Sequence, residues 1–123
     1  RAYPLDAGLD LYSIENVNIL KNDIVTVRTG IAVAIPKHYF GLMCLRSSLG
    51  KKGLRIHHGV IDSGYRGELT ILLQKLVSKK LSIKKGERVA QLVILPVPKI
   101  KVKEVKKLPS SIRGTCGFGS SGL

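Results

Sequence analysis

The chain has 123 residues, of which 44% are hydrophobic, and it carries a formal net charge of +13. This length is typical of one domain with its own core, and no apolar run approaches the roughly 18 residues of a membrane-spanning helix. Two cysteines, without a CxxC pair or a Cys/His cluster, argue against a disulfide framework and a structural zinc site. The charge leaves three classes of partner: nucleic acid, an anionic membrane or a phosphorylated small molecule.

Alternation of apolar with polar or small residues predicts an all-β chain of short strands. In chain order the pattern occurs in segments 16–20, 24–27, 31–36, 81–83, 89–95 and 100–105. Segment 68–77 (ELTILLQKLV) fits both helical and strand spacing, and its strand-like neighbours favour a strand. We therefore expect a sandwich, jelly roll or barrel with at most one short helix.

The lysine excess has a plain interpretation and a functional one. Many lysines lie in 78–85 and 98–107, where they alternate with apolar residues as on a strand with one solvated face. Solvated faces are therefore the first expectation, and binding of a polyanion or nuclear import is the alternative. With four Tyr, two Phe and no Trp, surfaces for stacking single-stranded nucleic acid are few. Cys44, within the apolar stretch FGLMCL, is expected to be a small buried hydrophobe.

Five stretches interrupt the alternation and hold many of the polar residues. They are 6–13, 46–54, 59–68, 86–92 and 113–122. Arginine forks, hydroxyls and glycine backbone N–H groups are the groups that bind phosphate oxygens. Asp10 and Asp62 would repel phosphate unless one binds a hard cation, usually through its water, or activates a water nucleophile. The set predicts a site for a nucleoside phosphate with a divalent cation.

Each stretch alone is a weak signal. RSSLG is a turn in most chains, and an aspartate such as Asp62, between Ile61 and Ser63, is often a turn residue. An arginine such as Arg88 is more often a structural ion-pair partner than a ligand. Asp6, just before the first of these motifs, is expected to cap a turn. The P-loop pattern GxxxxGK[ST] does not occur.

Taken together, the five stretches resemble the five motifs of the trimeric deoxyuridine triphosphate nucleotidohydrolase (dUTPase) family. The matching segments are AGLDLYS, RSSLG, GVIDSGYRGE, GERVAQL and RGTCGFGSSG, which run from residue 7 to residue 122. The resemblance implies an all-β, dUTPase-like jelly roll or distorted β-barrel over 1–112, with a mobile glycine-rich C-terminal lid at 113–123. It also implies Mg²⁺-dependent hydrolysis of dUTP to dUMP and pyrophosphate, which limits uracil entry into DNA and supplies dUMP for dTTP synthesis.

The resemblance also implies residue roles. Asp62 would orient and deprotonate the water that attacks the α-phosphorus, and Asp10 would hold Mg²⁺, through a water. Tyr65 would pack beneath the deoxyribose and exclude a 2′-hydroxyl, while backbone groups of a hairpin around 59–62 would read the uracil edge. The remaining substrate-binding residues that it implies are Arg46, Ser47, Ser48, Gly59, Val60, Ile61, Gln91, Arg113, Phe118, Gly119, Ser120 and Ser121. The alternative for Gln91 is a strand residue that faces solvent.

Two departures from the family pattern occur, and we expect neither to abolish activity. The second motif reads RSS where RSG is commoner, and the fifth reads GSSG where GSTG is commoner. RSSLG is also the version in dCTP deaminases, a sister family, but those enzymes carry a glutamate in the strand after the third motif. Here that strand has no carboxylate after Glu68. A catalytically silent interaction module and a basic nucleic-acid module also stay open.

The family resemblance implies a homotrimer with its sites at subunit interfaces and dUTP as the substrate. It implies no membrane partner, and nucleic acid or another polyanion only as a secondary partner. The sequence has no signal-peptide pattern. Its first residue is Arg and not Met, so we expect that residues are missing from its N-terminus. We expect it to act inside the cell, in cytoplasm or nucleus, with a virus-encoded origin as an open alternative.

Overall fold

The computed structural model describes residues 3–57 and 59–117. These contain short strands and a single helical turn, in agreement with the expected all-β class. The elements in chain order are β1 (Gly8–Tyr12), β2 (Val17–Ile19), β3 (Ile24–Arg28), β4 (Tyr39–Leu45), α1 (Ser47–Gly50), β5 (Leu54–Ile56), β6 (Val60–Ile61), β7 (Thr70–Lys75), β8 (Leu81–Ile83) and β9 (Arg88–Pro96).

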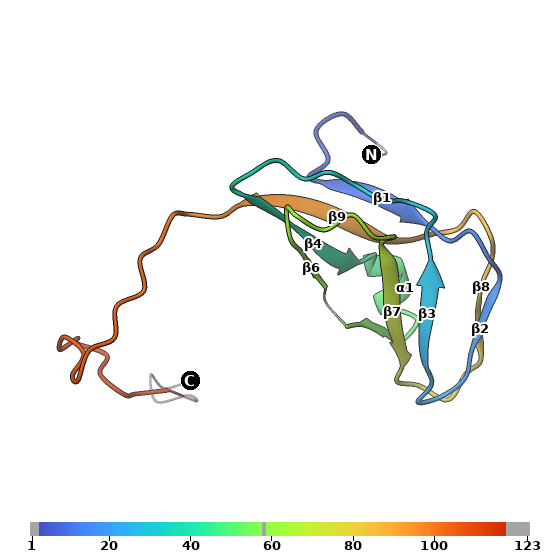
Figure 1. The fold of residues 1–123 in the computed structure, drawn as a ribbon. Helices are drawn as coiled ribbons and strands as arrows, with labels where there is room; N and C mark the ends of the chain where they lie inside the picture. Colours follow the sequence, from blue (N-terminus) through green and yellow to red (C-terminus); the bar gives the residue numbers. More distant parts are fainter. Residues whose placement is uncertain (1–2, 58, 118–123) are drawn as a thin grey trace.

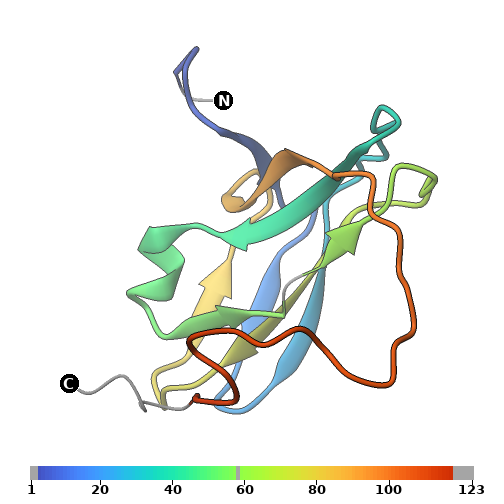
Figure 2. The same cartoon turned by 90° about the vertical axis from the view of Figure 1, so that its left-hand side faces the viewer.

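The strands form three sheets in the described part of the chain, and not one closed ladder. A four-stranded sheet has the order β1-β9-β4-β6, a three-stranded sheet has the order β3-β7-β5, and β2 pairs with β8. All pairs are antiparallel. Strands of the four-stranded sheet cross those of the three-stranded sheet, and the β2–β8 pair closes one end (Figures 1 and 2).

Aliphatic side chains from all three sheets make the core. Val27, Ile71, Leu73 and Val89 are completely buried, and Leu92 is nearly so. Two consecutive residues of β9, Val89 and Ala90, are buried because the register with β1 shifts between Leu11 and Tyr12. Such a bulge re-aims the side chains beside it.

The structure confirms most of the expected strands. Segments 16–20, 24–27, 81–83 and 89–95 contain β2, β3, β8 and β9. The ambiguous segment 68–77 contains strand β7, whose alternate residues Ile71 and Leu73 are buried while Leu72 is partly exposed. The first motif is one of the expected interruptions, but residues 8–12 form strand β1.

Two of the expected strands are absent from the structure. Segment 31–36 alternates in burial, with Ile35 buried and Ala34 exposed, but its backbone pairs with no strand. Gly30, with φ +67°, turns the chain before it, and Pro36 lacks a donor. The alternating sequence of 31–36 therefore corresponds to an extended segment that packs on the core with one side, and not to a strand paired in a sheet.

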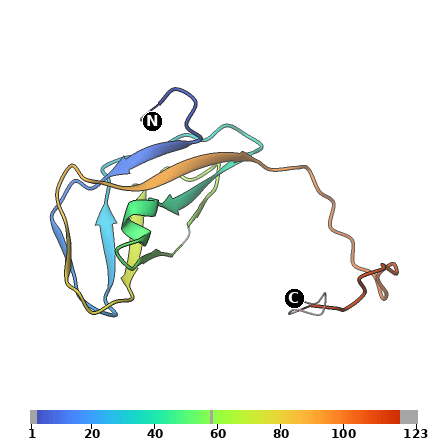
Figure 3. The ribbon, with the colours of Figure 1, turned by 180° about the vertical axis from the view of Figure 1, so that it is seen from behind.

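Residues 97–117 leave the body after β9 and follow an extended path away from it (Figures 1 and 3). Segment 100–105, also expected to be a strand, has no partner, and Ile100 and Val102 are 77% and 93% exposed. Its lysines are therefore solvated, but not as one face of a strand. In the described ranges, no helix is long and apolar enough to cross a membrane.

Gly41 permits close packing of the four-stranded sheet on the core, which gives a first prediction. A Cβ at this position would lie 2.7 Å from Leu92 Cδ1 and 3.0 Å from Ile35 Cδ1. Gly41→Ala should therefore lower the free energy of unfolding by about 1–3 kcal/mol, measured by urea denaturation. Gly64→Ala is the matched control, because nothing lies within 4 Å of its Cβ position. Equal stability of the two variants would contradict this packing.

Candidate functional site

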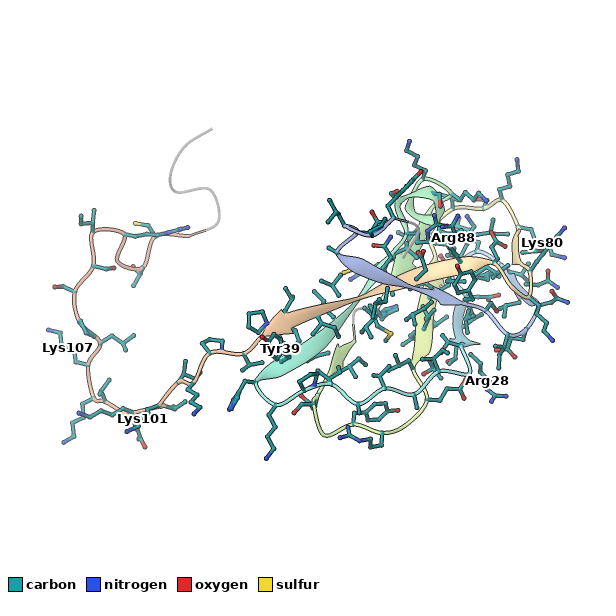
Figure 4. The ribbon with its side chains drawn as sticks, turned by 90° about the horizontal axis from the view of Figure 1, so that it is seen from above. Arg28, Tyr39, Lys80, Arg88, Lys101 and Lys107 are labelled. Atoms are coloured by element: carbon teal, nitrogen blue, oxygen red, sulfur yellow. The ribbon has the colours of Figure 1, made fainter. Side chains whose placement is uncertain are left out.

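A pocket of about 330 Å³ gathers the first, second and fourth motifs. The Asp10 carboxylate, 8% exposed, lies 3.5 Å from Arg88 Nη1 and 3.8 Å from Arg46 Nε. Arg88 begins β9, at the end of the sheet far from the tail (Figure 4), and the bulge in the β1–β9 ladder allows it to approach Asp10. The expected pairing role of Arg88 is thus confirmed, and Arg46 shares the same carboxylate.

Gln91 faces this pocket and is half-buried, in contrast to the solvent-facing alternative. It is opposite Asp10 in the β1–β9 ladder and opposite Cys44 in the β4–β9 ladder, so the three side chains share one face. Gly8 makes room for it, since a Cβ there would lie 2.6 Å from Gln91 Oε1. Cys44 is only partly buried, so the expectation that it is a buried core residue is wrong.

The second motif forms the start of α1, which directly follows β4 (Figure 3). Arg46 precedes the helix in extended conformation, and its N–H donates to the Val89 carbonyl. Ser47 and Ser48 are exposed in the first turn, where their hydroxyls can reach an anion. Asp6 caps the N-terminal turn, as expected, by accepting a bond from the Tyr3 N–H at 2.9 Å.

The donor set of this pocket fits a metal ion carried by a substrate better than a metal cage built by the protein. No group of three or more His, Cys, Asp or Glu that could hold a metal occurs in residues 3–57 and 59–117. Asp10 is one carboxylate between two guanidinium groups, and both separations exceed hydrogen-bond length. Its oxygens therefore retain capacity to accept a bond from a water on Mg²⁺, an ion that commonly keeps waters and binds substrate phosphates.

A second pocket, of about 280 Å³, is built from the third motif. Val60, Ile61, Asp62 and Tyr65 line it. Asp62 is exposed, and its carboxylate has no hydrogen-bond or ion-pair partner among the described residues. The carboxylate is therefore free to bind a water.

β6 is an edge strand, paired on one side with β4. Gly59 precedes it with its carbonyl bonded to the Met43 N–H, and a Cβ at Gly59 would lie 2.8 Å from Met43 Cε. The chain after β6 crosses to the three-stranded sheet, because β7 pairs with β3 and β5. Strands β5 and β7, on either side of the third motif, are antiparallel partners, so residues 59–62 lie on the long connection of a hairpin, and backbone groups on the open edge of β6 remain available.

Glu68 fixes the end of the third motif. Its carboxylate accepts a bond from the Gly30 N–H at 2.8 Å and pairs with Arg28 at 3.1 Å. The Gly30 N–H and then the Arg28 guanidinium lower the pKa of Glu68 below its ordinary value of 4.5. The Tyr65 hydroxyl donates to the Glu68 carbonyl at 3.2 Å. A Cβ at Gly67 would clash with that hydroxyl, so a larger residue there would have to displace the end of the Tyr65 side chain.

The two pockets share no lining residue and lie toward opposite ends of β4. Ile61 is opposite Gly41, so Asp62 lies beside the start of β4, whereas Arg46 follows its end. Six residues of strand span roughly 20 Å. Figure 4 shows Tyr39, the first residue of β4, and Arg88 at opposite ends of the sheet.

The fifth motif lies on the segment that departs from the body. Arg113 is exposed, and its Nε donates to the Cys116 carbonyl at 3.0 Å. Phe118, Gly119, Ser120 and Ser121 lie outside the described residues. The structure thus unites Asp10, Arg46 and Gln91 in one pocket and Asp62 with Tyr65 in another, and it brings Arg113 to neither.

Sequence reasoning missed some residues of both pockets. Tyr3 and Gly8 line the first pocket, and Met43 lines the second. Arg28 is 40 residues from Glu68 in the chain, so nothing in the local sequence indicates their pairing. Gly8 could have been found from the sequence, because a glycine within a strand often marks a position that another group approaches closely.

Known proteins resemble this chain along nearly its whole length. It matches the model of the dUTPase family over residues 1–122. The deoxyuridine 5'-triphosphate nucleotidohydrolase of Hydrogenobaculum sp. (strain Y04AAS1) is 42% identical over 121 residues, which are 95% of this chain and 84% of that protein.

Two solved structures are also similar. The dUTPase of Staphylococcus bacteriophage 80alpha with dUPNHPP is 36% identical, with a TM-score of 0.90, and the match covers 100% of this chain and 90% of that one. A variant dUTPase from phage phi11 of S. aureus, described with a structural Mg(II) ion, is 29% identical, with a TM-score of 0.82. That match covers 89% of this chain and 90% of the other.

The Glu68 pairing predicts a pH-dependent contribution to stability. Because the pKa of Glu68 is lower in the folded chain than its ordinary 4.5, the charged carboxylate stabilises the fold above that value. This stabilisation is lost as the pH falls through the folded pKa. Glu68→Gln should lower the urea midpoint at neutral pH and change it little in acid.

Glu104→Gln is the control, since Glu104 lies on the extended segment and has no hydrogen bond or ion pair within the described ranges. It should leave the midpoint unchanged at both pH values. A loss for Glu68→Gln that is as large in acid as at neutral pH would show that its charge is not the cause.

Proposed function

This chain belongs to the dUTPase family, a family of hydrolases, and on that premise we propose that it hydrolyses dUTP to dUMP and pyrophosphate. The observation that carries the proposal is the unpartnered Asp62 carboxylate in a pocket beside Tyr65, together with a separate arginine-rich pocket around Asp10. A water-activating group and a phosphate-binding group are the two parts that this reaction needs.

Asp62 is the proposed general base. It accepts a proton from a bound water, the water oxygen forms a bond to the α-phosphorus, and the bond from that phosphorus to the bridging oxygen breaks. Pyrophosphate leaves with the electron pair of the broken bond. The exposed position of Asp62 supports this role, because its carboxylate oxygens remain able to accept a hydrogen bond from the attacking water.

Arg46, Arg88 and Gln91 offer the donors for the triphosphate, with Ser47 and Ser48 at the start of α1. Asp10 lies between the two guanidinium groups, which reduces their mutual repulsion and leaves their other N–H groups free. Mg²⁺, held by the phosphates and by a water that Asp10 binds, would neutralise charge on the triphosphate when present.

The uracil and the sugar are proposed to bind at β6 and Tyr65. At β6 the proposed donors and acceptors are backbone groups of Gly59, Val60 and Ile61, other than the Gly59 carbonyl that the Met43 N–H occupies. They can hydrogen-bond to uracil, and with cytosine they would leave buried groups unpaired. The Tyr65 ring is held by its bond to the Glu68 carbonyl, so it can pack beneath a deoxyribose and exclude a 2′-hydroxyl.

We propose that one copy of the chain does not supply both parts to one substrate. Asp62 must lie within one water of the α-phosphorus, yet roughly 20 Å of strand separates it from Arg46. We therefore propose a homotrimer with each site at a subunit interface. Residues 113–123 would act as a lid over a site on another copy, with Arg113 toward the γ-phosphate, Phe118 on the uracil and Gly119–Ser121 over the phosphates.

The sister deaminase activity has less support. Glu68, the carboxylate at the end of the third motif, is already occupied by Arg28 and the Gly30 N–H. We expect the enzyme to act inside cells, in cytoplasm or nucleus, and its likeness to phage dUTPases is compatible with a virus-encoded origin.

The proposed role of Asp62 is tested by replacing it with asparagine. Asp62→Asn keeps the size of the side chain but removes its ability to take a proton, so pyrophosphate release should fall by at least about 10²-fold. Affinity for dUPNHPP, measured by calorimetry, should change little. Ser63→Ala, the adjacent control, should retain the wild-type rate.

Release of pyrophosphate by Asp62→Asn at the wild-type rate would rule out the general-base role. UTP cleavage as fast as that of dUTP would refute the sugar role of Tyr65. Ammonia from dCTP would favour the deaminase.

A further inference from the structure

A third hollow, of about 530 Å³, lies apart from both pockets of the proposed site. Five lysines line it: Lys51, Lys52, Lys75, Lys79 and Lys80. It shares no lining residue with the Asp10 pocket or the Asp62 pocket. Lys80 projects from the end of the body opposite the tail (Figure 4). We call this feature the basic hollow.

Lys75 is the unusual member of the basic hollow, because its residue is only 1% exposed. It continues the inward face of β7 after Ile71 and Leu73, where an apolar residue would be ordinary. Its ammonium donates to the Lys52 carbonyl. The Leu76 N–H bonds the Gly53 carbonyl at 3.0 Å, so strand and loop are fixed around this ammonium.

The charge of Lys75 lacks a counter-charge in residues 3–57 and 59–117. An ammonium has three donors, and the described residues supply one acceptor, a carbonyl. The Asp23 carboxylate accepts a bond from the Leu20 N–H at 2.9 Å and forms no ion pair with the Lys75 ammonium. A buried cation is costly unless it is paired, so an anion would complete this environment.

The rest of the lining defines the chemical class of that anion. Five of the nine lining residues are lysines and none is acidic, which suits a ligand with several negative charges. Val77 and Leu81 add apolar wall, and the volume lies within the usual range for small-molecule pockets. No arginine or aromatic side chain lines it, so the stacking that holds single-stranded nucleic acid is missing.

We propose that the basic hollow is a binding site for a small anion with two or more phosphate groups, distinct from the site of dUTP hydrolysis. The Lys75 ammonium binds the anion at the base of the hollow, and Lys51, Lys52, Lys79 and Lys80 surround it at the mouth. This assignment stands on the lysines alone and does not require the proposed function.

The test is a titration of the full chain with tripolyphosphate, followed by the amide signals of ¹⁵N-labelled protein. The Gly50 and Gly53 amides, which line the basic hollow, should shift with saturation. Gly8 reports the Asp10 pocket and separates binding there from binding in the hollow. Lys79→Ala/Lys80→Ala should weaken the affinity reported by Gly50 and Gly53 about tenfold.

Lys37→Ala/Lys101→Ala is the matched control. It removes two positive charges, as many as Lys79→Ala/Lys80→Ala, but from exposed lysines that do not line the basic hollow. It should change the affinity for tripolyphosphate less than about twofold. Lys75→Met replaces the buried ammonium by an apolar chain of similar length and should abolish the Gly53 shift. If that variant does not fold, the two double variants still decide the matter.

Three outcomes would overturn the proposal. One is a shift of Gly8 without shifts of Gly50 and Gly53. The second is an equal loss of affinity in both double variants, which would indicate attraction by net charge alone. The third is the absence of saturable binding at millimolar tripolyphosphate.

Discussion

The ladder between β4 and β9 determines where the charged groups of the proposed phosphate pocket lie. Gln91 lies near one end of this ladder, with Asp10 opposite it on β1, and the bulge beside them allows Arg88 to approach the same carboxylate. A one-residue slip would turn each of these side chains to the other face of the sheet. Buried Leu92 and Met43 on the core side resist that slip, so the packing of the core maintains the geometry of the pocket.

The two basic regions of the molecule differ in whether a carboxylate balances their positive charges. At the Asp10 pocket a carboxylate separates two guanidinium groups, so the pocket can exist without a ligand and still present free donors. In the basic hollow, Lys75 is buried without a carboxylate among the described residues, and its environment is incomplete without an anion. A net charge of +13 favours the approach of anions to both.

The sequence was sufficient for the class of fold and for the residues of each motif, because alternation and motif composition are local properties. It could not separate an extended segment from a paired strand, as 31–36 and 100–105 illustrate, because pairing depends on a partner distant in the chain. The pairing of Arg28 with Glu68 and the burial of Lys75 are likewise results of tertiary packing. Motif order also gave no indication that Asp62 and Arg46 lie at opposite ends of β4.

Because of this separation, we propose that the catalytic site is shared between copies of the chain. The decisive measurement combines Asp62→Asn chains with Arg46→Ala chains, each inactive alone, by refolding them together in equal amounts. If Asp62 and Arg46 act from different copies, random mixing leaves both intact at one site in four, and about one quarter of the wild-type dUTP hydrolysis should return. If mixed assemblies form and no activity returns, both groups act from one chain, and a site shared between subunits is contradicted.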